Sequence, residues 1–248
     1  MIMTEQIEKQ NNLKTLVHED ERLDDLGNGV QIIQNPNGYC FTSDSVLLAN
    51  LVSANRKSTV VDFCSGSGIV GILVGIKHSP KRTICVEVQP YLADMCERSI
   101  KLNQLPNIEV LHSDVKSAYE VLGREMADII TANPPYYRLN EGEMSPDERI
   151  SIARHEVKLT LHDLITSANK LLKYGGRFYV VYRADRLAEL ITELSENKLE
   201  PKEIVCVQPT SKKEIDTVLV VAKKGAEKGV RVRTLLREEI EKNYAILR

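Results

Sequence analysis

A run of polar, proline and aromatic residues, Asn133-Pro134-Pro135-Tyr136-Tyr137, directly follows a short apolar stretch of the chain. Neither proline has an N–H to donate, so a β-strand that reaches this point must end there. The side-chain oxygen of Asn133 and the carbonyl of Pro134 are then two hydrogen-bond acceptors at a strand end, with the flat ring of Tyr136 beside them. Such a group suits a planar amine, either the exocyclic NH2 of a nucleobase or the NH2 of an amide.

The chemistry that this arrangement favours is transfer of a group to an amine nitrogen. The lone pair of such an amine is delocalised, which makes the nitrogen a poor nucleophile. Two acceptors that bind its hydrogens favour a more pyramidal nitrogen and stabilise the positive charge developing there, as an oxyanion hole does for negative charge. The alternative is that the two prolines merely form a turn that ends a strand.

Further candidates follow the ends of other predicted strands. Gly66 and Gly68 form a tight turn of the kind that lets backbone approach a ligand closely. Glu87 ends the next strand about 20 residues later, the position from which a carboxylate accepts from a ribose diol. Asp114 follows the third strand and could accept from an adenine amino group. Because ligands bind at the carboxyl ends of parallel strands, these residues and Asn133 predict one site.

Each member of this series also has a purely structural explanation. The glycine turn could bind any dinucleotide, Glu87 could be a solvated strand end, and Asp114 could cap a helix at residues 115–123. Asp62 is expected to be buried in its strand, where it could serve only to orient the glycine turn. The ordered series, with one feature after each successive strand, is more specific than any single member.

The rest of the chain supplies the elements that would position these residues. Segments typical of strands and helices alternate, which predicts an α/β fold with a parallel sheet and right-handed crossovers. Strands are predicted at residues 30–34, 59–64, 83–88, 107–111, 127–131, 177–182, 203–207 and 216–222. Helices are predicted at residues 45–51, 69–76, 90–103, 115–123, 159–173, 184–197 and 234–244. The last two strands lack an intervening helix and should form an antiparallel hairpin at one sheet edge.

The predicted organisation is one domain at residues 30–248, preceded by a loose, polar and acidic arm at residues 1–29. The domain closes with a basic segment at residues 223–248. The polar stretch at residues 138–158 is long for a connection in a compact fold, so a functional lid or a flexible loop is expected there.

Composition limits the function classes. The 248 residues carry a net charge of −2, so any nucleic-acid binding must use a local basic patch. The sequence has neither an apolar run long enough for a membrane span nor the apolar core of a signal peptide at its start. Its five cysteines are scattered and its histidines form no ligand motif, which predicts a cytoplasmic protein with reduced thiols and no metal site. The oligomeric state stays open.

The combination of motifs resembles a known family. FTSDSVLLAN at residues 41–50, DFCSGSG at residues 62–68 and NPPYY at residues 133–137 are similar to motifs of class I S-adenosylmethionine-dependent amino-methyltransferases. In particular they look like those of the bacterial enzymes that methylate adenine N6 beside the anticodon of a valine tRNA. The resemblance covers about residues 30–222. It implies a Rossmann-like fold with a seven-stranded, mostly parallel sheet, an antiparallel last strand and helices on both faces.

The resemblance also implies roles for individual residues. S-adenosylmethionine would lie over the glycine turn, with its ribose at Glu87, its adenine near Asp114 and its methyl group toward Asn133. The implied cofactor-binding residues are Asp62, Cys64, Gly66, Gly68, Glu87, Asp114, Val115 and Asn133, and the implied catalytic residues are Asn133, Pro134 and Tyr136. Cys64 departs from the commonest pattern, which has glycine there, and a side chain should be tolerated only if the backbone is not left-handed.

A local basic patch is present at the C-terminal end. Residues 198–248 contain twelve Lys and Arg against eight Asp and Glu, whereas residues 1–50 contain three against eight. The candidate phosphate contacts are Lys212, Lys213, Lys223, Lys224, Lys228, Arg231, Arg233 and Arg237. Together with Tyr136 and Tyr137, Arg231 and Arg233 are expected to bind a tRNA substrate, although an ordinary solvated basic end would look the same.

Several other functions fit parts of this pattern. N5-methylation of a protein glutamine would use the same Asn-Pro-Pro-Tyr group on an amide, although a pair of tyrosines favours a stacked base. DNA adenine and ribosomal RNA guanine are also possible amine substrates. A dinucleotide-dependent oxidoreductase is a further alternative, but a full GxGxxG is lacking. A non-catalytic RNA-binding module is the last.

Overall fold

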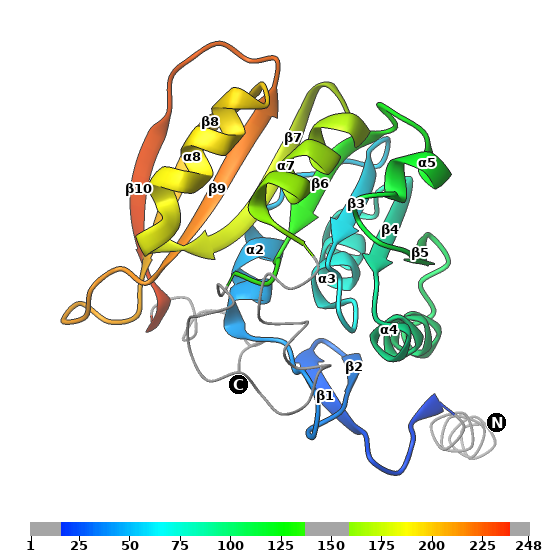
Figure 1. Ribbon diagram of the computed structural model, residues 1–248. Coiled ribbons are helices and arrows are strands. Elements are labelled where there is room, and N and C mark those ends of the chain that lie inside the picture. The colour runs from blue at the N-terminus through cyan, green and yellow to red at the C-terminus, as the bar shows by residue number, and fades with distance from the viewer. Residues whose placement is uncertain (1–15, 137–158, 239–248) are drawn as a thin grey trace.

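An eight-stranded sheet runs through the residues that the computed structural model describes, 16–136 and 159–238 (Figure 1). Its strand order is β10-β8-β9-β7-β6-β3-β4-β5. The strands are β3 (Thr59–Phe63), β4 (Arg82–Glu87), β5 (Ile108–His112), β6 (Ala127–Ala132), β7 (Leu172–Arg183), β8 (Leu199–Gln208), β9 (Thr217–Lys224) and β10 (Arg231–Leu236). Strands β5, β4, β3, β6 and β7 are parallel neighbours, so their carboxyl ends lie at one edge.

Helices cover both faces of this sheet, as the α/β prediction requires (Figure 1). One face packs under α5 (Ala118–Leu122), α7 (Leu161–Leu171) and α8 (Leu187–Glu196), the last preceded by the 3-10 turn Ala184–Arg186. The other face packs under α2 (Ser43–Leu51), α3 (Ile69–His78) and α4 (Pro90–Leu102). The central strands are apolar on both sides because both faces are buried. The Rossmann-like class is therefore confirmed.

The edge beyond β7 differs from the prediction. Strand β9 is antiparallel to both β7 and β8, which confirms the antiparallel hairpin. An eighth strand, β10, then pairs in parallel with β8 where a seven-stranded sheet was expected. Residues 234–236 belong to this strand and not to the predicted terminal helix. Without β10, the backbone N–H and C=O groups along one side of β8 would be unpaired, and this explains why strand pairing prevails.

The expected loose arm is also partly wrong. Residues Arg22–Gly27 form strand β1, which pairs with β2 (Val30–Gln34) as a hairpin. Asn28 and Gly29 at its turn both have positive φ, at 54° and 78°. Asn-Gly is the sequence signal for such a turn, because both residues tolerate left-handed backbone.

The hairpin is attached to the domain through α4. The backbone N–H of Ile33 donates to Ser99 Oγ at 3.0 Å, and Ile33 itself is fully buried. Before the hairpin, Glu21 accepts two hydrogen bonds of 2.6 Å from the guanidinium of Arg98. This part of the arm therefore has a fixed place.

Smaller boundary differences follow from local chemistry. Helix α7 begins after Thr160, whose side chain and that of Asp163 form a reciprocal capping box. It ends at Leu171, two residues before the predicted end at residue 173, and Gly175 and Gly176 lie inside β7. The predicted loop at 138–158 lies outside the described residues. None of the described helices has the length and apolar character needed to cross a bilayer.

Candidate functional site

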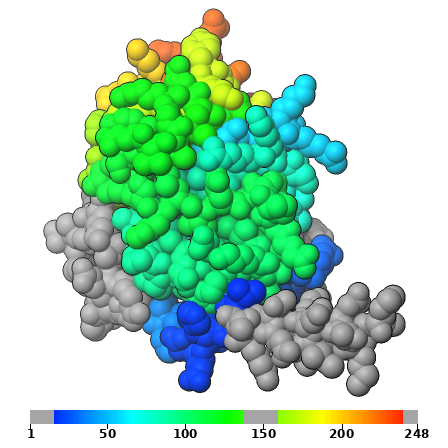
Figure 2. Space-filling view, turned by 90° about the vertical axis from the view of Figure 1, so that its right-hand side faces the viewer, coloured from blue at the N-terminus to red at the C-terminus, as the bar shows by residue number. Residues whose placement is uncertain are grey.

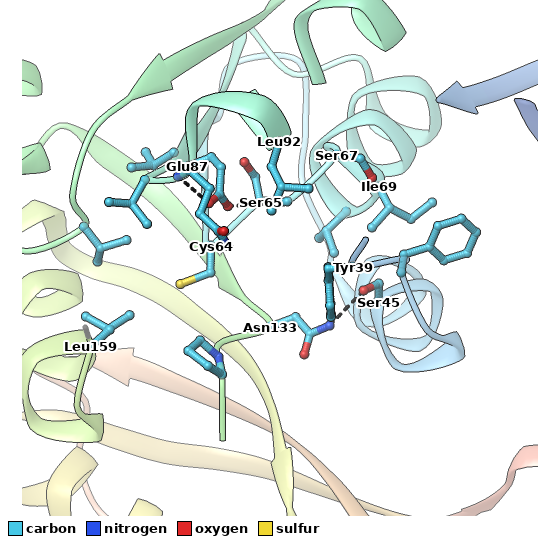
Figure 3. Close-up of a pocket in the computed structure, with 18 of the residues that line it drawn as sticks. Tyr39, Ser45, Cys64, Ser65, Ser67, Ile69, Glu87, Leu92, Asn133 and Leu159 are labelled. Atoms are coloured by element: carbon cyan, nitrogen blue, oxygen red, sulfur yellow. Dashed lines mark hydrogen bonds between the residues drawn. The ribbon is translucent and has the colours of Figure 1, made fainter. Parts of the chain in front are cut away.

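A pocket opens at the carboxyl ends of the central parallel strands (Figure 3). It contains about 820 Å³ of space between atoms, part of it open to solvent. Its lining brings together six of the predicted site residues: Cys64, Gly66, Glu87, Asp114, Val115 and Asn133. Asp62, Gly68 and Pro134 lie outside this lining.

Glu87 is hydrogen-bonded to the glycine turn, with which it was predicted to form one site. Its Oε2 accepts from the backbone N–H of Gly66 at 2.8 Å, and its Oε1 accepts from that of Gln89 at 2.9 Å. The side chain is 5% exposed, and this burial raises the pKa of its carboxyl group. A carboxylate has about four acceptor sites, so Glu87 can still accept from a hydroxyl group of a ligand.

Asp62 holds the first turn of α3 and does not form part of the pocket wall. Its Oδ2 accepts from the N–H of Gly71 at 3.2 Å, and its Oδ1 accepts from Thr131 Oγ1 at 2.6 Å. Burial raises the pKa of Asp62 to about 7. The direct cofactor contact expected of this residue is therefore replaced by a positioning role, which was the structural alternative.

Gly68 serves packing more than ligand access. A Cβ added there would stand 2.4 Å from the sulfur of Cys96, and the backbone has φ +95°. Gly68 is also the residue before the first turn of α3, so its small size lets α3 approach α4. Gly66, with φ +56°, is the glycine that lines the pocket.

A side chain at position 64 was expected only if the backbone there is not left-handed, and Cys64 contradicts this expectation. Its backbone is left-handed, with φ 54°, a conformation that costs a residue with a side chain about 1–2 kcal/mol. The side chain nevertheless lines the pocket. Burial raises the pKa of its thiol well above the usual value, so the group is neutral at physiological pH. A cysteine is thus accommodated where the family pattern has glycine, in the strained conformation.

Asn133 stands at the mouth of the pocket and is held by a residue from α2. Its Nδ2 donates to Ser45 Oγ at 2.8 Å, which leaves Oδ1 as the acceptor of the amide (Figure 3). The ring of Tyr39 also lines this part of the pocket, together with Phe41. Ser45 and Tyr39 were not predicted as site residues: Tyr39 lies outside the quoted motifs, and Ser45, although within FTSDSVLLAN, begins the helix predicted at residues 45–51.

Tyr136 lies on the other side of this segment, in a second pocket. Its ring makes an edge-on contact with Tyr182, with centroids 6.2 Å apart and an interplanar angle of 77°. Its carbonyl accepts from Arg186 Nη1 at 3.0 Å. The residues lining this second pocket are mostly polar: Asp44, Tyr136, Tyr182, Arg183, Asp185, Ile215, Asp216, Thr217 and Arg237. The segment from Asn133 to Tyr136 thus separates two pockets.

Arg237 closes one wall of the second pocket and is not a surface phosphate contact. Its guanidinium donates to Asp44 Oδ1 at 2.7 Å, to Thr217 Oγ1 at 3.1 Å and to the Ser43 hydroxyl. The side chains of Arg237 and Asp44 are only 16% and 13% exposed. These contacts join the end of β10 to the first turn of α2.

Lys224 is likewise used inside the fold. Its ammonium donates to the carbonyls of Asn169 and Leu172, at 2.7 and 2.8 Å, and to Glu125 Oε1 at 3.1 Å. Two of its three partners are therefore backbone carbonyls at the C-terminal end of α7, where a positive charge is favourable. The prediction that Lys224 contacts phosphate is wrong, because its ammonium already donates to these three acceptors.

The two arginines predicted to bind substrate lie on β10. The Arg231 side chain is 87% exposed, whereas Arg233 Nε donates to Glu203 Oε1 at 2.8 Å. Alternate residues of a strand share a face, so Arg231, Arg233 and Leu235 point the same way. Tyr137, the other predicted substrate contact, lies outside the described residues.

The β5 edge of the sheet contributes Asp114 and Val115, which directly follow β5, to the site. Figure 2 views the molecule from the side on which β5, α4 and α5 lie, with part of the β1–β2 hairpin at the bottom. The predicted catalytic and cofactor-binding residues that the structure describes all lie at the carboxyl ends of β3, β4, β5 and β6 or in the segments that directly follow them.

Comparisons with known sequences point to methyl transfer. The model of a family described as "Methyltransferase small domain" matches residues 41–197. A tRNA1(Val) (adenine(37)-N6)-methyltransferase of Porphyromonas gingivalis is 25% identical over 155 residues, which is 60% of this chain and 60% of that relative. A protein of the same name from Aliivibrio salmonicida is 22% identical over 184 residues, 74% of this chain and 76% of that relative. The chain thus spans about 60% of the length of the first relative.

Solved structures share the fold. A predicted O-methyltransferase from Agrobacterium tumefaciens superposes with a TM-score of 0.59 at 22% identity, covering 78% of this chain and 85% of that one. M. jannaschii TYW2 in complex with AdoMet (S-adenosylmethionine) superposes with a TM-score of 0.58 at 17% identity, covering 83% and 86%. At these identities the likeness concerns the fold alone.

Proposed function

Because this chain belongs to the methyltransferase small domain family and is an S-adenosylmethionine-dependent methyltransferase, we propose that it methylates N6 of an adenine in tRNA, at the position next to the anticodon. Membership in this family decides against the dinucleotide-dependent oxidoreductase. Two relatives that carry the tRNA name support the substrate, at identities of 25% and 22%.

The observation that carries this proposal is the position of the Asn133–Tyr136 segment between two pockets. Asn133 and Pro135 line the first pocket, and Tyr136 lines the second. An amine bound against Tyr136 and a methyl donor bound over the glycine turn would therefore come together beside Asn133. Bringing two bound molecules together in this way is worth several kcal/mol of the activation barrier, about 7–11 in the best intramolecular cases.

The residues of the first pocket fit the family's methyl donor. Glu87 offers carboxylate oxygens where ribose hydroxyls can donate, and Asp114 lies on the same wall for the adenine. The hydroxyl of Ser65 is buried, lies on this wall and has no hydrogen-bond partner among the described residues. An unpaired buried hydroxyl is costly unless a ligand satisfies it. We assign Ser65, Gly66, Glu87, Asp114 and Val115 to donor binding.

S-adenosylmethionine supplies a methyl group that is already activated as a sulfonium, so the protein's task is mainly to position and stabilise the amine. Asn133 Oδ1 and the carbonyl of Pro134 would accept the two amine hydrogens. They would stabilise the positive charge on nitrogen until one proton leaves for solvent. The Tyr136 ring would stack on the target base, a contact worth about 1–3 kcal/mol.

Arg231 and Arg233 are proposed to contact the tRNA backbone, and Tyr137 is proposed to contact the substrate near the target base. The exposed Arg231 is the stronger candidate, because Arg233 is already paired with Glu203 at 2.8 Å, whereas Arg231 reaches that carboxylate only at 4.0 Å. An adenine beside the anticodon is unpaired in folded tRNA, so moving it onto Tyr136 costs less than flipping it from a duplex.

A methyl-transfer assay with radiolabelled S-adenosylmethionine tests the substrate. Folded valine tRNA, the same tRNA with guanine replacing the target adenine, duplex DNA and a glutamine-containing peptide are compared, and the labelled nucleoside is identified by mass spectrometry. We expect N6-methyladenosine in the first tRNA only. Label in the peptide would favour glutamine methylation, and equal label in duplex DNA or in the altered tRNA would refute the proposed position.

A further inference from the structure

The Ser45 hydroxyl contacts Asn133 although the two residues are 88 positions apart in the sequence. The hydrogen bond from Asn133 Nδ2 to Ser45 Oγ measures 2.8 Å, and Figure 3 shows it as a dashed line between two residues that line the first pocket. Ser45 is 3% exposed. Water therefore competes little for this contact, and the orientation of the amide depends on one serine.

We infer that Ser45 is a positioning residue, which holds the Asn133 amide so that its oxygen faces the amine to be methylated. This inference rests on the proposed function, in which Asn133 accepts a hydrogen bond from that amine. A primary amide has an accepting oxygen on one side and two donating hydrogens on the other. Rotated by half a turn, Asn133 would present donors to the amine and lose the stabilising contact. The bond to Ser45 occupies Nδ2 and leaves Oδ1 available.

The serine is itself held in place from two sides. Val46 and Leu48, on the same helix, are fully buried in the core beneath the sheet. On the other side, Arg237 bonds Asp44 at 2.7 Å and so fixes the first turn of α2. A hydroxyl on so constrained a helix can hold the Asn133 amide at one place, with Oγ accepting from Nδ2 as observed, which a mobile loop residue could not do.

Steady-state kinetics with the tRNA substrate test this role. For Ser45→Ala we expect a kcat roughly tenfold lower, the size of one neutral hydrogen bond, with KM for tRNA and the dissociation constant for S-adenosylmethionine unchanged. Ser45→Thr, which keeps a hydroxyl, should recover most of the rate. Ser53→Ala makes the same chemical change at an exposed position just after α2 and is the matched control.

The double variant separates positioning from packing. In an Asn133→Ala background, Ser45→Ala should cause no further loss of kcat, because the amide that it positions is gone. A normal kcat for Ser45→Ala, an equal loss in both backgrounds, or a weaker binding of S-adenosylmethionine would each overturn the inference.

A second measurement needs no substrate. The side-chain amide signals of Asn133 are identified in 15N spectra by their disappearance in Asn133→Ala. We expect slow hydrogen exchange of these signals in the wild type and in Ser53→Ala, and faster exchange in Ser45→Ala. Equal exchange in all three would refute the positioning role. A protein that methylates none of the substrates refutes the proposed function, while this experiment still decides the role of Ser45.

Discussion

The two pockets on either side of the segment from Asn133 to Tyr136 are built in different ways. The first consists of residues at the carboxyl ends of parallel strands, with buried groups such as Glu87 bonded to backbone N–H groups of the glycine turn. The second consists of charged side chains from distant parts of the chain, joined by Arg237. The first is thus a property of the sheet, and the second depends on how β10 and α2 are brought together. We expect changes in one pocket to leave ligand affinity in the other nearly intact.

Asn133→Ala should give the largest effect, because it removes the side chain proposed to hold the amine beside the methyl donor. We expect methyl transfer to fall on the order of 10²–10³-fold, by analogy with oxyanion donors, while S-adenosylmethionine binding is nearly unchanged. Single-turnover rates at saturating tRNA and calorimetric titration of the donor check this. Near-wild-type turnover would contradict the role of Asn133.

Glu87→Ala should weaken the first pocket alone. Removal of a charge-assisted hydrogen bond, worth roughly 1.5–3 kcal/mol, predicts an affinity for S-adenosylmethionine that is about 10- to 100-fold weaker. Binding of tRNA should stay the same. Glu109→Ala removes a more exposed carboxylate from β5 and serves as the control. If calorimetry shows the same donor affinity in both variants, Glu87 is only a strand end.

Arg237→Ala should affect the second pocket more than donor binding in the first. Asp44 would lose its guanidinium partner, so we expect a raised KM for tRNA and a loss of about 1–3 kcal/mol in the free energy of unfolding. Arg237→Lys keeps the charge but not the planar fork and should show an intermediate KM. Equal losses of donor and tRNA affinity would mean that the two pockets do not act separately.

Arg231→Gln should weaken tRNA binding only through the loss of one positive charge. Removing one phosphate-binding cation lowers the slope of log K against log salt by about one. Arg233→Gln should change the slope less, because its guanidinium is shared with Glu203. Lys57→Gln, an exposed change at the amino end of β3, is the control. Identical salt slopes in all three variants would place the RNA elsewhere.

Asp62→Asn should alter the pH dependence of stability with little effect on binding. The folded protein keeps the Asp62 proton up to about pH 7, whereas the unfolded chain releases it near the ordinary pKa of 3.8. Between these values the folded state binds more protons, so wild-type stability falls as pH rises. The asparagine variant lacks this loss and should gain roughly 1–3 kcal/mol relative to wild type as the pH rises through this window. Parallel stability curves from urea denaturation would contradict the raised pKa.

The contrast between the pockets also explains what the sequence could predict. Gly66, Glu87, Asp114 and Asn133 each follow an apolar strand, and parallel strands place their ends together whatever the details of packing. Their convergence in one pocket could therefore be inferred from local patterns. For Asp62 the sequence allowed both a cofactor contact and a supporting role, and burial beside Thr131 decided between them.

Other parts of the site depend on contacts that no local pattern contains. Ser45 meets Asn133 across 88 positions, and Arg237 meets Ser43 across 194. The same holds for residues 231–236, where no strand was predicted and a helix was expected from residue 234, and whose pairing depends on the open side of β8. Local backbone chemistry determined the strands, the glycine turn and the series of polar strand ends. Only tertiary packing decided the second pocket, the eighth strand and the orientation of the Asn133 amide, because each depends on a partner distant in sequence.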